Sequence, residues 1–133
     1  PVRVENIEFH RMHTEYLDVS EETCAKIEQT RQAGGRIIAV GTTGVRALET
    51  AWQDGKARPF QGQTNLFIRP GYHFQCVDAM ITNFHLPGST LLMLVSAFAG
   101  HQRIFDAYRY AAEKRFRFYS YGDAMVIFRR ESP

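Results

Sequence analysis

The sequence predicts an α/β fold with a largely parallel or mixed sheet flanked by helices. Short β-branched runs alternate with amphipathic stretches along the chain, an order typical of strands connected by helices. The chain has 133 residues, 44% of them hydrophobic and 13% aromatic, which is enough to bury the core of one domain. Its longest mainly apolar run, residues 91–99, falls far short of the roughly 20 residues that span a membrane. We therefore expect a single domain without a membrane segment.

The first half of the chain is expected to alternate strands and helices. Ser20 before two acidic residues is typical of a helix start, and the glycine pair at 34–35 is typical of a helix end. The β-branched run at 36–40, bounded by glycines, predicts a strand buried on both faces of a parallel sheet. The expected elements are an extended segment at 10–19, a helix from Ser20 to the glycine pair, a strand at 36–40, and a helix that follows the turn at 41–44 and ends at Asp54 and Gly55.

The second half continues the alternation. Ser89 is expected to cap an apolar helix that reaches Ala99. A further amphipathic helix is expected after Gly100, with its apolar side turned inward. The predicted strands are 65–68, 76–82 and 124–128, and the inward residues of the last helix are Ile104, Phe105, Tyr108, Ala111 and Ala112.

Charge and cysteine content limit the function classes. The net charge of +2 is too small to drive non-specific nucleic-acid binding by counterion release alone. Residues 103–130, however, contain seven basic residues against three acidic ones, so the C-terminal part is the basic face. Cys24 and Cys76 have no second Cys or His at the short spacing that zinc or redox motifs require. We therefore expect no metal site, and the isolated thiols suit a reducing cytoplasm.

The turn after the first predicted buried strand is a candidate anion site. In parallel α/β sheets, ligands gather at the carboxyl ends of the strands. Thr42 and Thr43 offer hydroxyl groups there, the helix N-terminus offers N–H groups, and Arg46 follows one turn later. Plain helix capping by the threonines remains open beside this interpretation.

The segment at 82–89 is a second candidate, because it places Thr82, Asn83 and His85 between two apolar elements. Histidine can move protons near neutral pH, so His85 is the best candidate for an acid or base. Ser89 is more simply explained as a helix cap.

A third candidate interleaves aromatic residues with arginine at 115–119 and ends at Asp123. Such a pattern could stack bases and hold phosphates. A half-buried strand followed by a hairpin turn explains it equally well. If the turn lies at the sheet edge opposite the other two candidates, Asp123 is only a turn residue.

Four motifs together resemble the S-adenosylmethionine:tRNA ribosyltransferase-isomerase family of the queuosine pathway. Their order and spacing match from one end of the chain to the other. The motifs are Met12–Tyr16 (MHTEY), Gly41–Glu49 (GTTGVRALE), Thr82–Leu91 (TNFHLPGSTL) and Phe118–Met125 (FYSYGDAM). The resemblance implies that residues 1–133 are the C-terminal portion of a larger, barrel-like catalytic α/β domain, without its N-terminal portion and its inserted β-barrel domain. The opening at Pro1, with neither an initiator Met nor a signal peptide, fits that expectation.

The resemblance also implies a reaction. The ribosyl part of S-adenosylmethionine, a co-substrate, moves to 7-aminomethyl-7-deazaguanine at the tRNA wobble position and is isomerised, giving epoxyqueuosine, adenine and methionine. The roles are placed by chemistry onto the matching positions. His85 transfers a proton with support from Asn83, and Arg46, Thr42 and Thr43 hold a carboxylate or phosphate. Tyr119 or Tyr121 faces adenine or the sulfonium, and Asp123 or Glu15 accepts from the amine nucleophile. We expect a cytoplasmic monomer whose partner is that tRNA, and an isolated fragment without activity.

Two other function classes remain open at this point. One is an RNA-binding module without catalysis, built on the basic aromatic segment. The other is a small nucleotide-binding or regulatory domain that uses only the Gly41 turn. Three separate polar segments in one short chain are more than either needs, so an enzyme is favoured.

Overall fold

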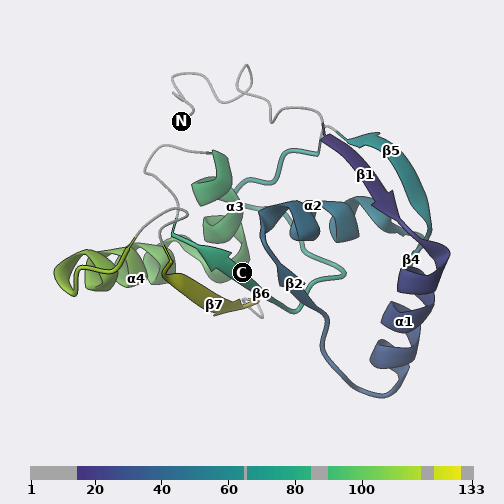
Figure 1. Cartoon of the computed structure of the whole chain (residues 1–133), viewed down its shortest axis with the longest axis horizontal. Helices are drawn as coiled ribbons and strands as arrows, with labels where there is room; N and C mark the ends of the chain where they lie inside the picture. The colour runs from purple at the N-terminus through teal and green to yellow at the C-terminus, as the bar shows by residue number, and fades with distance from the viewer. Residues whose placement is uncertain (1–14, 65, 85–89, 118–121, 130–133) are drawn as a thin grey trace.

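The computed structural model of the chain describes residues 15–64, 66–84, 90–117 and 122–129. Figure 1 shows strands and helices alternating along most of the chain. The elements are β1 (Glu15–Val19), α1 (Glu21–Gln32), β2 (Ile38–Val40), α2 (Thr42–Ala51), β3 (Trp52–Gln53), β4 (Lys56–Ala57), β5 (Phe60–Thr64), β6 (Ala79–Asn83), α3 (Thr90–Ala99), α4 (His101–Glu113) and β7 (Ala124–Phe128). The predicted α/β class is confirmed.

The start and end of α1 follow the predicted signals. The Ser20 hydroxyl accepts a hydrogen bond from the Thr23 amide at 3.1 Å, which satisfies one of the open N–H groups of the first turn. Gly34 follows the helix with φ +79°, a conformation that glycine adopts without a steric penalty.

The central sheet is mixed, with strand order β2-β6-β7. β2 runs parallel to β6, and β7 runs antiparallel to it. Two smaller antiparallel pairs, β1 with β5 and β3 with β4, complete the described strands. Asp54 and Gly55 form the turn between β3 and β4, both with positive φ. The sequence prediction ended a helix at this turn and missed the hairpin and β5.

One face of the central sheet is covered. Helix α2 contacts β2 and β6, and α3 contacts β7. Between the sheet and these helices lie the buried side chains of Ala39, Met80 and Ile127, which belong to the main core.

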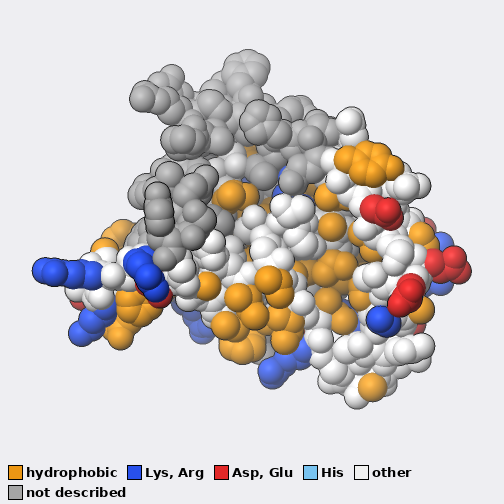
Figure 2. Space-filling model, viewed as in Figure 1, with side chains coloured by type: hydrophobic (Ala, Val, Ile, Leu, Met, Phe, Trp, Pro, Cys, Tyr) orange, Lys and Arg blue, Asp and Glu red, His pale blue; other side chains and the backbone are white. Residues whose placement is uncertain are grey.

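The other face is open, and the prediction that the 36–40 strand is buried on both faces is wrong. Val40, Ile81 and Val126 align across the three strands, and their side chains are 74%, 36% and 59% exposed. Ile38 and Phe128 extend the same apolar face. Figure 2 shows hydrophobic side chains gathered where Figure 1 draws β6 and β7. The sheet was expected to be covered by helices on both faces, but α1 packs against β4 and does not cover this one. We call these five residues the open face.

Two predicted strands differ because side chains occupy the backbone groups that a ladder would use. Residues 66–68 form no strand: the Leu66 amide donates to the Thr64 hydroxyl at 3.2 Å, and the Leu66 carbonyl accepts from Arg46. Residues 76 and 77 precede β6 instead of opening it, since both amides donate to the Glu49 carboxylate.

Helix α4 also differs from its predicted orientation. Ile104 and Ala111 are buried as expected, whereas Phe105 and Ala112 are exposed. The inward side of the helix is therefore narrower than its apolar sequence suggests.

Candidate active site

The three polar segments meet at one edge of the central sheet. Val40 pairs with Ile81, and the amide of Gly41 donates to the Ile81 carbonyl at 2.7 Å, so the turn after β2 lies beside the end of β6. On the other side of β6, Ala124 pairs with Asn83, which brings the beginning of β7 to the same edge. The two turns were expected at one sheet edge with Arg46 and His85 facing a common cleft. The shared edge is confirmed and Asp123 lies there too, whereas the common cleft stays a prediction, because His85 lies outside the described residues.

Helix α2 begins at this edge. Gly41 precedes it with φ +86°, and its side-chain-free backbone allows the sharp turn from β2 into the helix. Thr42 is partly exposed and Thr43 is exposed. No acidic residue occupies the first turn, so the positive end of the helix dipole is directed toward this edge without a neutralising carboxylate from the helix itself.

Arg46 lies one turn into α2 and is buried, with 1% of its surface exposed. Its guanidinium donates from Nε and Nη2 to the Leu66 carbonyl, at 3.2 and 3.0 Å. The residue therefore holds the segment that follows β5 against α2. The predicted contact of Arg46 with a substrate anion stays a prediction, and the same guanidinium would have to serve both purposes.

Glu49, one further turn along α2, was missed by the sequence analysis. Its buried carboxylate accepts four hydrogen bonds: from the Tyr72 hydroxyl at 3.1 Å and from the amides of Gln75, Cys76 and Val77 at 2.9, 2.9 and 3.0 Å. A glutamate beside Leu48 in the apolar half of an amphipathic helix was the signal that could have found it. Arg46 and Glu49 thus fix both ends of the 66–77 segment, which leads into β6.

The Glu49 carboxylate changes the acidity of its neighbours. Burial, and then the nearby negative charge, raise the pKa of the Cys76 thiol to about 12. The same two causes raise the pKa of the Tyr72 hydroxyl above its usual range. Both groups therefore stay protonated near neutral pH, and neither is suited to act as a nucleophile there.

Asp123 holds the turn that precedes β7. Its carboxylate accepts a short hydrogen bond from the Arg117 amide, and it lies 3.7 Å from Arg117 Nε. The side chain is 34% exposed. The turn lies at the same edge as the other candidates, so the condition under which Asp123 would be only a turn residue is not met. Its role with a substrate amine stays a prediction.

At the end of β6, alternate side chains have different surroundings. Thr82 is buried, Asn83 is exposed on the same side of the strand as Ile81, and Phe84 is buried again. Asn83 therefore stands where the open face meets the candidate site. The Phe84 ring makes edge-to-face contacts with Tyr108 and Phe116, at centroid distances of 5.2 and 5.9 Å.

Glu15 begins β1, where its backbone pairs with Thr64, two residues before the Leu66 carbonyl that Arg46 binds. The side chain of Glu15, together with His85, Ser89, Tyr119 and Tyr121, lies outside the described residues.

Within the described parts of the chain, no group of three or more His, Cys, Asp or Glu residues is arranged to hold a metal ion. No helix in those parts is both long enough and apolar enough to cross a membrane.

A family model described as "Queuosine biosynthesis protein" matches residues 1–127. The chain belongs to this family. The S-adenosylmethionine:tRNA ribosyltransferase-isomerase of Francisella tularensis subsp. tularensis is 59% identical over 128 residues, which are 96% of this chain and 38% of that protein. The protein of the same name from Nitrosococcus oceani is 61% identical over 127 residues, covering 96% and 37%.

A solved structure agrees with the family assignment. The crystal structure of the S-adenosylmethionine tRNA ribosyltransferase from Thermotoga maritima has a TM-score of 0.80 and 52% identity, and the match covers 85% of this chain and 40% of that one. The resemblance to the queuosine family is thus confirmed. The chain spans less than two fifths of the length of the curated relatives it matches.

Proposed function

We propose that the polypeptide containing this chain is an S-adenosylmethionine-dependent tRNA ribosyltransferase-isomerase. It transfers and isomerises the ribosyl group of S-adenosylmethionine onto 7-aminomethyl-7-deazaguanine at the wobble position of tRNA, giving epoxyqueuosine and releasing adenine and methionine. The relatives' names and the family model support this reaction. The observation that carries it is the meeting of three family motifs at one sheet edge, since each motif alone is an ordinary turn.

The roles follow the chemistry of each residue. His85 moves the proton made acidic by the sulfonium, and Asn83, exposed at the end of β6, supports it. Thr42 and Thr43 at the start of α2, with Arg46, hold a carboxylate or phosphate. In the same proposal, Tyr119 or Tyr121 faces adenine or the sulfonium, and Asp123 or Glu15 accepts from the amine.

The chain itself would be the C-terminal portion of the catalytic α/β domain, with the N-terminal portion and an inserted β-barrel domain elsewhere in a cytoplasmic, monomeric polypeptide. Its coverage of the relatives supports this, and so does the open face, because the sheets of α/β domains are normally covered on both sides. The part of the polypeptide that covers Ile81 and Val126 would also border Asn83, so the isolated chain should lack activity.

The test is His85→Gln in the full-length polypeptide. Glutamine keeps a polar group of similar reach but cannot titrate, and positioned proton transfer contributes about 10²- to 10⁴-fold in rate. Single-turnover adenine release at saturating S-adenosylmethionine and tRNA should fall in that range. His73→Gln is the matched control, because His73 is exposed on the segment before β6, and it should react at the wild-type rate.

Different outcomes separate the alternatives. A folded His85→Gln variant that reacts at the wild-type rate would make this histidine structural and move the acid or base role to Asp123 or Glu15. A wild-type protein that binds tRNA but releases no adenine would favour the RNA-binding module. Binding of an isolated nucleotide without any effect of tRNA would favour the regulatory domain.

A further inference from the structure

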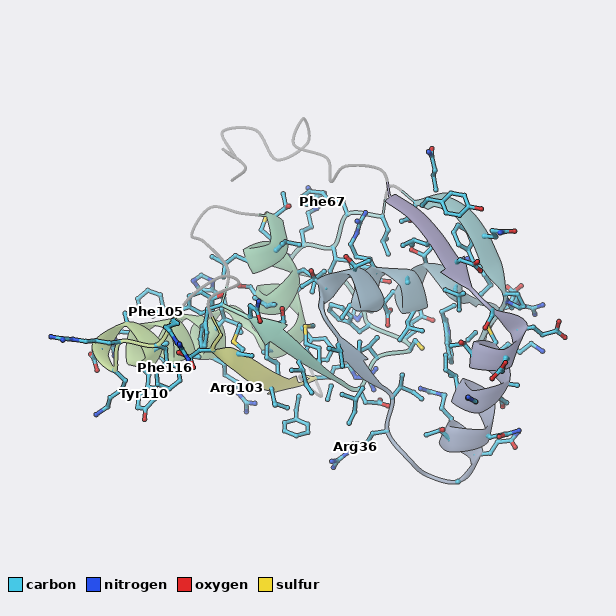
Figure 3. The ribbon with its side chains drawn as sticks, in the orientation of Figure 1. Arg36, Phe67, Arg103, Phe105, Tyr110 and Phe116 are labelled. Atoms are coloured by element: carbon cyan, nitrogen blue, oxygen red, sulfur yellow. The ribbon has the colours of Figure 1, made fainter. Side chains whose placement is uncertain are left out.

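Helix α4 and the turn after it expose three aromatic side chains. Phe105 and Tyr110 are 52% and 56% exposed, and Phe116 is 38% exposed. In Figure 3, Tyr110, Phe116 and Arg103 lie on one side of α4 and Phe105 lies on the opposite side. Rings of this size are normally turned into a core, so the exposed Tyr110 with Phe116 beside it suggests that this side contacts a partner.

Positive charge is concentrated on the same segment. Residues 101–117 contain five basic and two acidic residues, a net charge of +3, whereas the rest of the chain carries −1. Lys114 lies over the Tyr110 ring at 5.9 Å, and on the opposite side of α4 Arg109 lies over the Phe105 ring at 5.8 Å. One of the two acids, Asp106, already accepts a hydrogen bond from Gln102. Figure 2 shows this mixture of blue and orange where Figure 1 draws α4.

This pattern differs from that of the open face. The open face consists of Ile38, Val40, Ile81, Val126 and Phe128, a mainly aliphatic surface with one ring, over which Arg36 lies at 5.5 Å. A mainly aliphatic surface is expected where another part of a protein covers it. On α4, cations stand beside rings, which is the combination that binds a polyanion with exposed flat bases.

A row of rings connects α4 with the candidate active site. Phe84 directly follows Asn83 at the end of β6, and its ring contacts that of Phe116. Phe116 in turn makes an edge-to-face contact with Tyr110 at 5.9 Å. Phe84 itself is buried, and these contacts place the exposed rings of Phe116 and Tyr110 near the end of β6, within reach of a polymer that enters the sheet edge with one nucleotide.

We propose that one side of α4, made of Arg103, Tyr110, Lys114 and Phe116, binds the single-stranded loop of the substrate tRNA beside the reacting nucleotide. Unpaired bases stack on the two exposed rings, and the two cations contact phosphates. The inference rests on the proposed function for the identity of the RNA. The charge and exposure of the surface are independent of that function.

The test measures binding to the full-length polypeptide without relying on catalysis. The probe is a fluorescein-labelled anticodon stem–loop RNA, and the readout is its Kd by anisotropy over a range of salt concentrations. Tyr110→Ala should raise Kd by about 5- to 150-fold, the range that the loss of one base–aromatic stack produces. The matched control is Tyr16→Ala, because Tyr16 is 64% exposed on β1, and it should leave Kd unchanged.

The charged residues are tested together. The double substitution Arg103→Gln and Lys114→Gln should lower the slope of log Kd against log salt by about 1.4, since each phosphate contact to a single strand contributes about 0.7. Lys26→Gln and Lys56→Gln remove the same charge from exposed positions on α1 and on β4, and should leave the slope nearly unchanged.

Two results would overturn the proposal. The first is an equal change of slope in both double variants, which would reduce the effect to net charge. The second is an unchanged Kd with a lowered Tm in Tyr110→Ala, which would show that α4 packs against another part of the polypeptide. Loss of RNA binding in the α4 variants of a protein that never releases adenine would uphold the surface and reject the proposed function.

Discussion

The two faces of the central sheet differ in how completely the chain covers their apolar side chains. On the covered face, Met80 lies at 0% exposure beneath α2 and α3, and nearby buried polar groups such as Glu49 have hydrogen-bond partners. On the open face, Val40 and Val126 are more than half exposed although their side chains are as apolar as the core. The same three strands supply both faces, so the difference arises from what the helices cover.

This difference separates what the chain stabilises by itself from what a longer polypeptide would stabilise. The covered face holds the frame of the candidate site: β2, β6 and the α2 turn between them. The open face borders Asn83, so a segment of a longer polypeptide that lies on this face would also border the candidate site. Completing the fold and completing the pocket would then be one event.

The largest effect is expected from a charge on the open face. If the longer polypeptide covers this face, Val126→Asp would bury an unpaired carboxylate and should lower the free energy of unfolding of the full-length polypeptide by about 3–5 kcal/mol. Gln63→Asp introduces the same charge at an exposed strand position in β5 and should change it by less than about 0.5 kcal/mol. Urea unfolding measures both. Equal, small effects would mean that the face stays open in the longer polypeptide.

A smaller but still large effect is expected on the covered side, at Glu49. Glu49→Gln keeps the size of the side chain but turns one carboxylate oxygen into an N–H donor that faces other donors. Since an unsatisfied buried group costs about 1–3 kcal/mol, the free energy of unfolding should fall by about 2–4 kcal/mol. Glu28→Gln on the exposed side of α1, where the residue only accepts from Gln32, is the control and should be nearly neutral. A neutral Glu49→Gln would show that the loop is held mainly by its apolar contacts.

The sequence predicted best where local chemistry decides the structure. Ser20 starts α1, the glycine at 41 turns β2 into α2, and the apolar run at 124–128 forms β7, because each signal acts on its own backbone. The shared edge of the turns after β2 and β6 was also predictable, since parallel neighbours end at the same side.

What the sequence did not predict depends on contacts between distant residues. The amides at 76 and 77 are bound by Glu49, 27 and 28 positions earlier, and this delays the start of β6. The Leu66 carbonyl is bound by Arg46, 20 positions earlier, which prevents a strand there. Periodicity also cannot tell which of two apolar sheet faces a helix will cover, so burial of 36–40 on both faces was expected.

The smallest effect concerns the pH dependence of the covered side at Cys76. The thiol is fully buried, and burial and Glu49 raise its pKa from 9.0 to about 12. Below pH 9 the thiol is protonated in both the folded and the unfolded chain and contributes no pH dependence. Between pH 9 and about 12 the unfolded chain releases this proton while the folded chain retains it, so stability falls as pH rises, by at most about 1.4 kcal/mol per pH unit.

Comparing wild type with Cys76→Ala isolates this contribution, because the alanine variant lacks the titrating thiol although it is less stable at every pH. Thermal unfolding of the full-length polypeptide from about pH 8 to about pH 11 should show a steeper decline for the wild type. Cys24→Ala is the matched control: burial also raises the pKa of Cys24, but more weakly, so its removal should change the slope less. Parallel declines for wild type and Cys76→Ala would mean that Cys76 can ionise in the folded protein, and that water reaches the covered side of the sheet.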